Sequence, residues 1–264
     1  PYTTLFRSAG NMITVDVPGD IIQNEIGYAI TGEERLKAEV VKIQGDSAFM
    51  QVFESTKGLR VGDTVEFSGD MLSVELGPGI LGMVYDGLQN PLNELAKEHG
   101  FFLKRGAIMA PLDREKSWDF KPRAKKGDVL KAGDKIGTVK EGIFEHPIFL
   151  PFHFRGDYEI TSIVKEGEYK VEKVVAKAKD EQGEEHELKM YFNWPVKLAI
   201  QNYRDKMVPR EPMVTQTRII DTFFPVAKGG TYCIPGPFGA GKTVLQQVTS
   251  RFARVDIVII AACG

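Results

Sequence analysis

Alternating apolar and polar side chains predict a series of short β-strands in the first part of the chain. Every second residue of 36–40 is apolar and its neighbours are charged, and 48–52 repeats the same period of two. This period is that of a strand with one buried face. Strands are predicted at Met12–Val17, Glu25–Ile30, Leu36–Ile43, Ala48–Phe53, Thr64–Phe67 and Ser73–Leu76.

Turn residues, mostly glycine with aspartate or proline, separate these runs. Six short strands at roughly ten-residue spacing favour a small closed β-barrel over residues 11–76, and an open sheet packed on the next domain is the alternative. Residues 1–10 show no period that joins them to the first predicted strand, and the chain begins without methionine. They are left out of the predicted fold as a non-native or disordered start.

A second β-rich module is predicted at 111–190, after a junction at 77–110 that contains a short helix at Pro91–Glu98. The turns Gly127-Asp128 and Gly133-Asp134 are typical of lipoyl- and biotinyl-carrier sandwiches. No Met-Lys-Met or Asp-Lys-Ala tip accompanies them, so a sandwich without a prosthetic group is favoured over a swinging-arm carrier.

The apolar pattern changes to a helical period in the last part of the chain. Val244, Leu245, Val248 and Phe252 fall at helical spacing within 242–253. A short β-prone run, Thr231–Ile234, precedes this helix, and the almost wholly apolar Asp256–Ala262 comes after it, as expected of a buried parallel strand. Residues 191–264 are therefore predicted to be the first part of an α/β nucleotide-binding domain.

Between the predicted strand and helix lies a phosphate-binding motif, G-x-x-x-x-G-K-[ST]. Its residues are Gly236, Pro237, Phe238, Gly239, Ala240, Gly241, Lys242 and Thr243. Glycines let backbone N–H groups turn toward a phosphate, the lysine reaches the β- and γ-phosphates, and the threonine hydroxyl ligates Mg²⁺. The alternative is a glycine-rich turn that matches by chance, but the flanking elements favour binding of ATP or ADP with Mg²⁺.

Composition narrows the function classes. The chain has 264 residues, 27% of them charged, and a net charge of −2, so no basic field indicates a nucleic-acid partner. No apolar run approaches the roughly 18 residues that span a bilayer, and no secretory signal is visible, so a soluble, cytoplasmic chain is expected. Cys233 and Cys263 lie in apolar runs and are expected to be buried thiols.

Other candidate sites are weak. The four histidines, His99, His146, His153 and His186, lack metal-ligand spacing, so a zinc site is not expected. Phe101-Phe102 is interpreted as core packing, with nucleotide stacking as the alternative. The Lys- and Glu-rich 177–189 is interpreted as a solvated hairpin tip.

Several motifs together resemble the catalytic A subunits of V-type (vacuolar/archaeal-type) rotary ATPases, in their bacterial branch. The resemblance covers roughly 11–264, and the Pro237-Phe238 pair distinguishes this phosphate loop from most others. The remaining motifs are Gln51–Leu59, Leu76–Ile80, Tyr85–Gln89, Trp194-Pro195-Val196 and Arg218-x-x-Asp221-x-x-Phe224-Pro225. Asn90 and Gln216-Thr217 depart from the family pattern. These departures affect the assignment to a subfamily more than the function that the resemblance implies.

The resemblance implies a subunit that couples ATP hydrolysis or synthesis to proton or sodium transport. Lys242 would stabilise γ-phosphate charge, Thr243 would hold Mg²⁺, and a neighbouring B subunit of an alternating hexamer would supply an arginine finger. The barrel would join a crown ring, the 111–190 module would contact the peripheral stalk, and a central rotor stalk would complete the assembly. The headpiece would be peripheral, on the cytoplasmic face of the cell membrane, and would meet the membrane only through the membrane sector.

In that family a Glu-Arg-Gly run comes directly after the residues corresponding to Cys263-Gly264, and its glutamate positions the attacking water. That glutamate and the later Asp-bearing strand for Mg²⁺ are not among the 264 residues, so an N-terminal fragment is expected. Two alternatives stay open: another hexameric motor with this loop, such as a secretion or flagellar ATPase, and a non-hydrolysing nucleotide-binding or assembly fragment.

Overall fold

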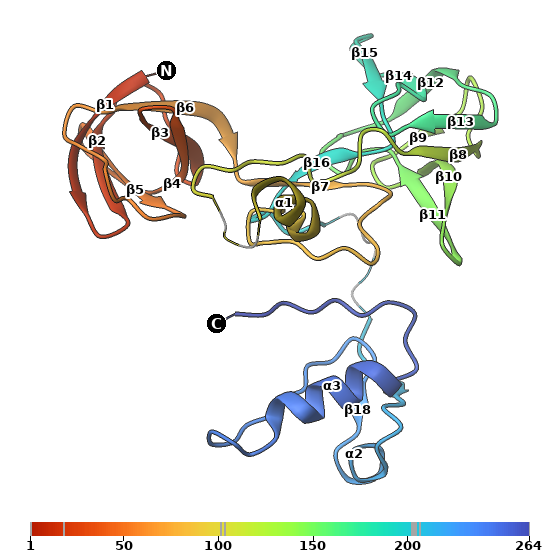
Figure 1. Cartoon of the computed structure of the whole chain (residues 1–264). Helices are drawn as coiled ribbons and strands as arrows, with labels where there is room; N and C mark the ends of the chain where they lie inside the picture. The colour runs from red at the N-terminus through yellow and green to blue at the C-terminus, as the bar shows by residue number, and fades with distance from the viewer. Residues whose placement is uncertain are drawn as a thin grey trace. The chain divides into compact units, whose positions relative to one another are not determined.

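The computed structural model describes residues 2–17, 19–100, 102, 104–201, 205 and 207–263. The chain divides into two compact units, 1–202 and 203–264, which are described separately. The first unit holds a β-barrel, a two-stranded ribbon with one helix, and a β-sandwich (Figure 1). Within the described ranges, no helix is long and apolar enough to cross a membrane.

The barrel is closed by six antiparallel strands in the order β1-β2-β5-β4-β3-β6. Its inward positions come from the period of two seen in the sequence, and Leu36, Met50 and Val65 are fully buried among them. Burial of each such side chain stabilises the fold by roughly 1.5–3 kcal/mol. The strands are β1 (Tyr2–Ala9), β2 (Met12–Asp16), β3 (Glu25–Thr31), β4 (Glu34–Gln44), β5 (Ser47–Val52) and β6 (Thr64–Met71).

The predicted number of barrel strands is confirmed, but one of the six predicted strands, 73–76, lies outside the barrel and β1 stands in its place. Tyr2–Ala9, left out of the predicted fold with the rest of 1–10, forms β1 and pairs with both β2 and β6. Leu5 N donates to Asp63 O at 2.8 Å and Gly62 N donates to Leu5 O at 2.9 Å. Only Leu5 of this strand is buried, so its sequence shows no alternation. Because β1 closes the ring, the open-sheet alternative is also wrong.

The predicted strand at 73–76 exists as β7 (Ser73–Leu76), but it lies outside the barrel. It pairs with β16 (Phe192–Pro195), with Leu76 opposite Phe192 and Ser73 opposite Pro195. The compact first unit therefore continues to residue 202, past the predicted domain boundary at 190/191. Helix α1 (Leu92–His99) comes after β7, close to its predicted position.

Two four-stranded sheets form the sandwich between β7 and β16, with the orders β11-β10-β8-β13 and β15-β14-β12-β9. Side chains from both sheets share one hydrophobic cluster around Phe120, Ile136, Ile160 and Leu188. The strands are β8 (Ser117–Pro122), β9 (Val129–Leu130), β10 (Lys135–Glu141), β11 (Phe144–Phe149), β12 (Tyr158–Ile163), β13 (Gly167–Lys170), β14 (Ala176–Lys179) and β15 (Glu185–Leu188). The predicted β-rich module and its solvated hairpin, β14–β15, are confirmed.

The second unit contains β17 (Pro212–Met213), α2 (Arg218–Phe223), β18 (Val226–Ala227) and α3 (Lys242–Phe252). Helix α3 confirms the predicted helix after the phosphate motif. The strands predicted at 231–234 and 256–262 are wrong for this structure, since both segments are extended without strand pairing. A parallel strand needs hydrogen-bonding neighbours, and none of the described segments pairs with either one.

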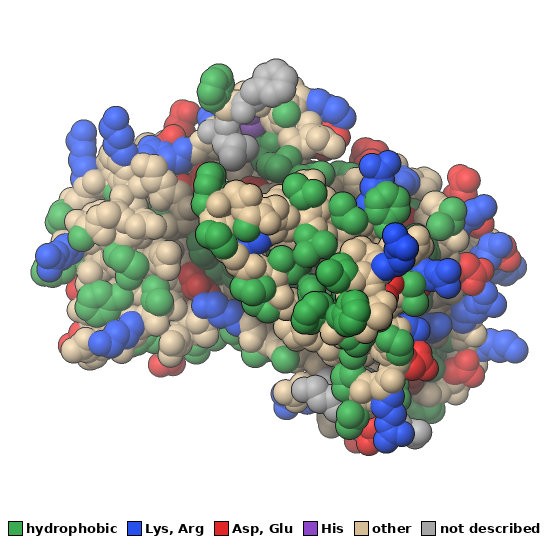
Figure 2. Space-filling view, turned by 90° about the horizontal axis from the view of Figure 1, so that it is seen from below, with side chains coloured by type: hydrophobic (Ala, Val, Ile, Leu, Met, Phe, Trp, Pro, Cys, Tyr) green, Lys and Arg blue, Asp and Glu red, His purple; other side chains and the backbone are tan. Residues whose placement is uncertain are grey.

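Acidic and basic side chains are interspersed on the face seen in Figure 2, with hydrophobic side chains between them. Phe102 is 89% exposed, so core packing is wrong for this residue, and Phe101 lies outside the described residues. Cys233 and Cys263 are both exposed thiols, contrary to the expected burial. Both lie in apolar segments that would be covered only if neighbouring strands were present.

The sandwich core should not accept a methyl group at Gly137. A Cβ atom there would overlap the Phe120 ring and lie 2.9 Å from Lys121 O, whereas a Cβ at Gly87 would meet nothing within 4 Å. We expect Gly137→Ala to lower the free energy of unfolding by roughly 1–3 kcal/mol. Gly87→Ala is the matched control and should change it little. Urea unfolding followed by tryptophan fluorescence measures both, and equal effects would contradict the packing argument.

Candidate functional site

The phosphate motif forms an exposed loop that leads directly into α3. Gly239 and Gly241 adopt φ angles of 78° and 82°, in the left-handed region that glycine adopts without strain. A Cβ atom on Gly236 would lie 3.2 Å from the Cβ of Ala240, so the two ends of the loop approach closely. The sequence thus encodes a tight turn whose last residue, Gly241, is the N-cap of α3.

Lys242 folds back over the loop. Its Nζ donates to the carbonyl of Gly236 and lies 3.4 Å from that of Pro237. The first turn of α3 has no side-chain cap, so no side-chain oxygen occupies its free N–H groups. Such N–H groups and the helix dipole favour an anion at this end. The lysine and the uncapped turn together form an exposed cationic site.

All eight predicted residues, 236–243, are contiguous in this loop and helix start. Thr243 is exposed at the beginning of α3, and Phe238 projects fully into solvent. The side chains are therefore accessible to a ligand, and the donor set suits a polyphosphate. Their individual roles remain predictions.

Asp221 stabilises the turn before α2. In the sequence this residue stood out only as part of a motif. Its carboxylate accepts hydrogen bonds from Thr215 Oγ1 at 2.7 Å, Thr215 N at 3.0 Å and Gln216 N at 3.1 Å. These bonds, first that of the Thr215 hydroxyl, hold the pKa of Asp221 below its usual range. They also hold Gln216 at a φ of 61°, a conformation that side chains other than glycine rarely adopt.

The turn held by Asp221 supports the segment that comes after α3. Arg254 N donates to Val214 O at 2.9 Å, and Ile220 of α2 is 3% exposed. Residues before α2 and after α3 are thus joined within the second unit. No periodic signal in the sequence indicates the contact between Thr215 and Asp221.

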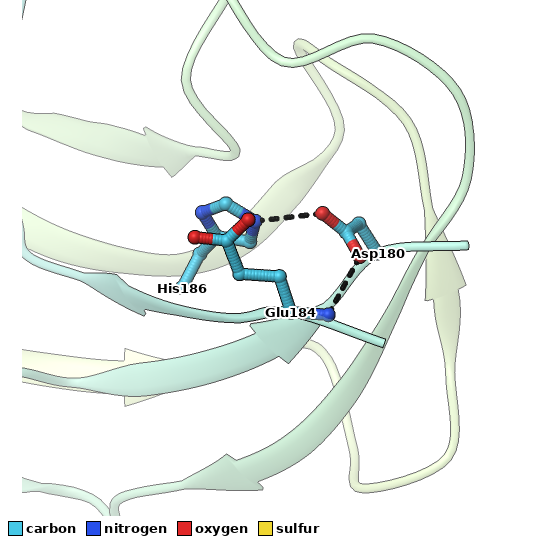
Figure 3. Close-up of side chains that lie close together, drawn as sticks. All are labelled: Asp180, Glu184 and His186. Atoms are coloured by element: carbon cyan, nitrogen blue, oxygen red, sulfur yellow. Dashed lines mark hydrogen bonds and ion pairs between the residues drawn. The ribbon is translucent and has the colours of Figure 1, made fainter. Parts of the chain in front are cut away.

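A second polar cluster lies at the tip of the β14–β15 hairpin. Asp180 accepts hydrogen bonds from Gln182 N at 3.0 Å and Glu184 N at 2.8 Å, and its other oxygen lies 3.0 Å from His186 Nε2 (Figure 3). The hydrogen bond to His186 is the main cause that lowers the pKa of Asp180.

Ligand atoms of Asp180, Glu184 and His186 lie within 4.8 Å of one another, a grouping that histidine spacing alone did not predict. The hydrogen bonds of Asp180 account for its place in the hairpin turn. Nothing at this exposed tip identifies a ligand.

Three models of the ATP synthase alpha/beta family match consecutive parts of the chain. The beta-barrel domain of the family matches residues 6–69, the alpha/beta subunit barrel-sandwich domain matches 109–197, and the nucleotide-binding domain matches 216–264. The order agrees with the barrel, the sandwich and the phosphate loop of the structure.

Curated relatives extend this match over nearly the whole chain. The V-type ATP synthase alpha chain of Borreliella burgdorferi (strain ZS7) is 56% identical over 255 residues, which are 97% of this chain and 44% of the relative. That of Treponema denticola (strain ATCC 35405) is 58% identical over 97% of this chain and 43% of its own length. The chain therefore spans less than half the length of these relatives.

The lowered pKa of Asp221 gives a pH dependence that can be measured. Its stabilisation of the turn is present above the unfolded pKa and is lost as the pH falls through the lower, folded pKa. We expect the amide shift of Thr215 to titrate with a midpoint below about 3.9, the ordinary value for aspartate. NMR titration measures this midpoint. Asp221→Asn should abolish the titration and Asp256→Asn should preserve it; a midpoint at or above the ordinary value would contradict the assignment.

The apolar segment after α3 should cause self-association. Ile259 is 90% exposed and Ile260 is 74% exposed, next to the half-exposed Ile257 and Val258. Contiguous exposed apolar side chains promote association in water. We expect Ile259→Lys with Ile260→Lys to raise the monomer fraction several-fold, as measured by sedimentation velocity. Ile143→Lys, at an isolated position 91% exposed, should have no such effect. A wild-type chain that stays monodisperse would contradict this prediction.

Proposed function

The chain belongs to the ATP synthase alpha/beta family, and from that membership we propose that it binds ATP or ADP with Mg²⁺ as part of a V-type ATP synthase alpha chain. The observation that carries the proposal is the loop 236–243, where positive-φ glycines lead into an uncapped helix and Lys242 lies over the loop. These donors suit phosphate oxygens, which accept from backbone N–H groups and from a lysine.

In the proposed complex, the backbone from Pro237 to Gly241 cradles the phosphates, with N–H donors from Phe238 onward because proline has none. Lys242 exchanges its carbonyl partners for γ-phosphate oxygens, which adds a charge-assisted hydrogen bond. The Thr243 hydroxyl would hold Mg²⁺, and the ion would neutralise phosphate charge when bound. Pro237 and Phe238 contribute no charged group, and Phe238 is free to pack against a neighbouring chain or the bound nucleotide.

For the whole protein we propose the activity that the relatives' name describes, ATP synthesis or its reverse, coupled to proton or sodium transport. The proposed partners are a B subunit in an alternating hexamer, a central rotor stalk and a peripheral stalk. The proposed location is the cytoplasmic face of the membrane, as part of a peripheral headpiece.

For residues 1–264 alone we propose nucleotide binding without turnover. In V-type A subunits a glutamate positions the attacking water, and an Asp-bearing strand helps to hold Mg²⁺. Neither is among these 264 residues. Phosphoryl transfer to water needs such a positioning group besides the charge supplied by the loop. The alternative of a secretion or flagellar ATPase is less well supported, because both relatives described above are V-type ATP synthase alpha chains.

Replacement of Lys242 tests the site. We expect Lys242→Ala to raise the Kd for Mg-ATP at least about tenfold, because one charge-assisted hydrogen bond contributes roughly 1.5–3 kcal/mol. Lys228→Ala is the matched control in the same unit, since Lys228 is exposed and lies 3.0 Å from the exposed Glu211, away from the loop sequence. Calorimetric titration measures both constants.

Equal affinities of the wild type and Lys242→Ala would contradict the proposed site. A phosphate-release assay on residues 1–264 tests the second part of the proposal. Turnover clearly above that of Lys242→Ala would show that the absent glutamate is not required.

A further inference from the structure

The turn Gly77–Gly82, directly after β7, lies against the sandwich. A Cβ atom on Gly77 would lie 2.6 Å from the Cβ of Tyr191, and one on Gly79 would lie 3.5 Å from the Trp118 ring. Gly79 has a φ of 108°, so its backbone takes a conformation that other residues avoid. This turn therefore approaches the sandwich closely through its backbone.

The carboxylate of Glu141, at the end of β10, accepts hydrogen bonds from two backbone amides of this turn. Its Oε1 accepts from Gly79 N at 2.7 Å and from Leu81 N at 3.3 Å, across 62 and 60 residues of sequence. The backbone hydrogen bond that follows, from Met83 N to Ile80 O, uses neither of these two amides. Glu141 is thus their acceptor among the described residues.

The second oxygen of Glu141 is also occupied. His146 Nδ1, from the adjacent strand β11, lies 2.6 Å from Glu141 Oε2. A carboxylate can only accept, so the proton of this bond belongs to Nδ1 of His146. Glu141 is 7% exposed, and a buried carboxylate is costly unless each oxygen has a donor. Three donors from two elements satisfy that requirement here.

A second polar contact, an ion pair, holds β7, the strand before the turn. Arg114 Nη2 lies 2.6 and 2.8 Å from the two carboxylate oxygens of Glu75 in β7. Its guanidinium carbon lies 4.5 Å from the centre of the Tyr191 ring, and its Nε lies 3.4 Å from Glu172. Strand β7 is therefore fixed by Arg114, whereas the turn beyond it depends on Glu141.

We propose that Glu141 is a positioning residue that latches the Gly77–Gly82 turn onto the sandwich, so that the two move as one body. The closed latch needs an accepting oxygen that faces the turn, since Oε1 of Glu141 accepts both amides there. His146 orients that carboxylate from the sandwich side. A displacement of the sandwich is then passed to the turn and to β7, independently of any bound nucleotide.

Hydrogen exchange of the full 264-residue chain tests the latch. We expect Glu141→Ala, which removes the acceptor of both amides, to speed exchange in the peptide that covers 77–82 at least about tenfold, the effect of losing roughly 1.4 kcal/mol of local protection. Glu145→Ala is the matched control, since Glu145 lies on the neighbouring strand, exposed and 3.4 Å from Arg123. Mass spectrometry measures both, with sandwich peptides that cover β8 and β10 as internal references.

Two results would overturn the proposal. One is unchanged exchange of 77–82 in Glu141→Ala; the other is an equal loss of protection in the sandwich peptides, which would make Glu141 a general stabiliser. His146→Ala keeps the carboxylate and its two amide bonds, so it should give a smaller increase confined to 77–82. An increase in His146→Ala that matches or exceeds that of Glu141→Ala would also contradict the latch.

Discussion

The sandwich is inserted between two strands that hydrogen-bond to each other, and this pairing of β7 with β16 arranges the first unit. Leu76 and Phe192 face one another although the whole sandwich separates them in sequence. Closure of so long a loop costs little more entropy than closure of a short one, because the cost grows only with the logarithm of length. The ribbon can therefore carry a complete folded module, provided that the module brings its own core.

Polar contacts then fix the sandwich on this ribbon. Arg114 pairs with Glu75 of β7, and Glu141 receives the amides of the turn after β7. The Glu141 carboxylate lies where hydrophobic packing alone would leave two backbone amides without an acceptor. Hydrogen bonds have strict distance and direction requirements, whereas apolar contacts tolerate sliding. This difference explains why charged residues, and not further apolar ones, lie at the junction of ribbon and sandwich.

Local signals predicted the features that local interactions determine. Helix α3 could be predicted from its apolar period, most barrel strands from alternation, and the phosphate loop from its glycines. Pairing between distant segments escaped prediction, since β1 shows one buried side chain and β7 looks like any other short strand. The donors to Asp221 and Glu141 were missed for the same reason, because a carboxylate in a sequence does not reveal which backbone amides it will meet.

The two halves of the nucleotide site differ in the same way. The loop 236–243 takes its shape from glycine conformations and from one helix, which are encoded within a few residues. The apolar segment 256–262 has an equally clear sequence, yet it is exposed and unpaired, because a strand becomes a strand only beside another. The loop therefore keeps its shape without strand pairing at 256–262 among the described residues. The proposed binding of phosphate rests on this local part, which glycine conformations and one helix determine.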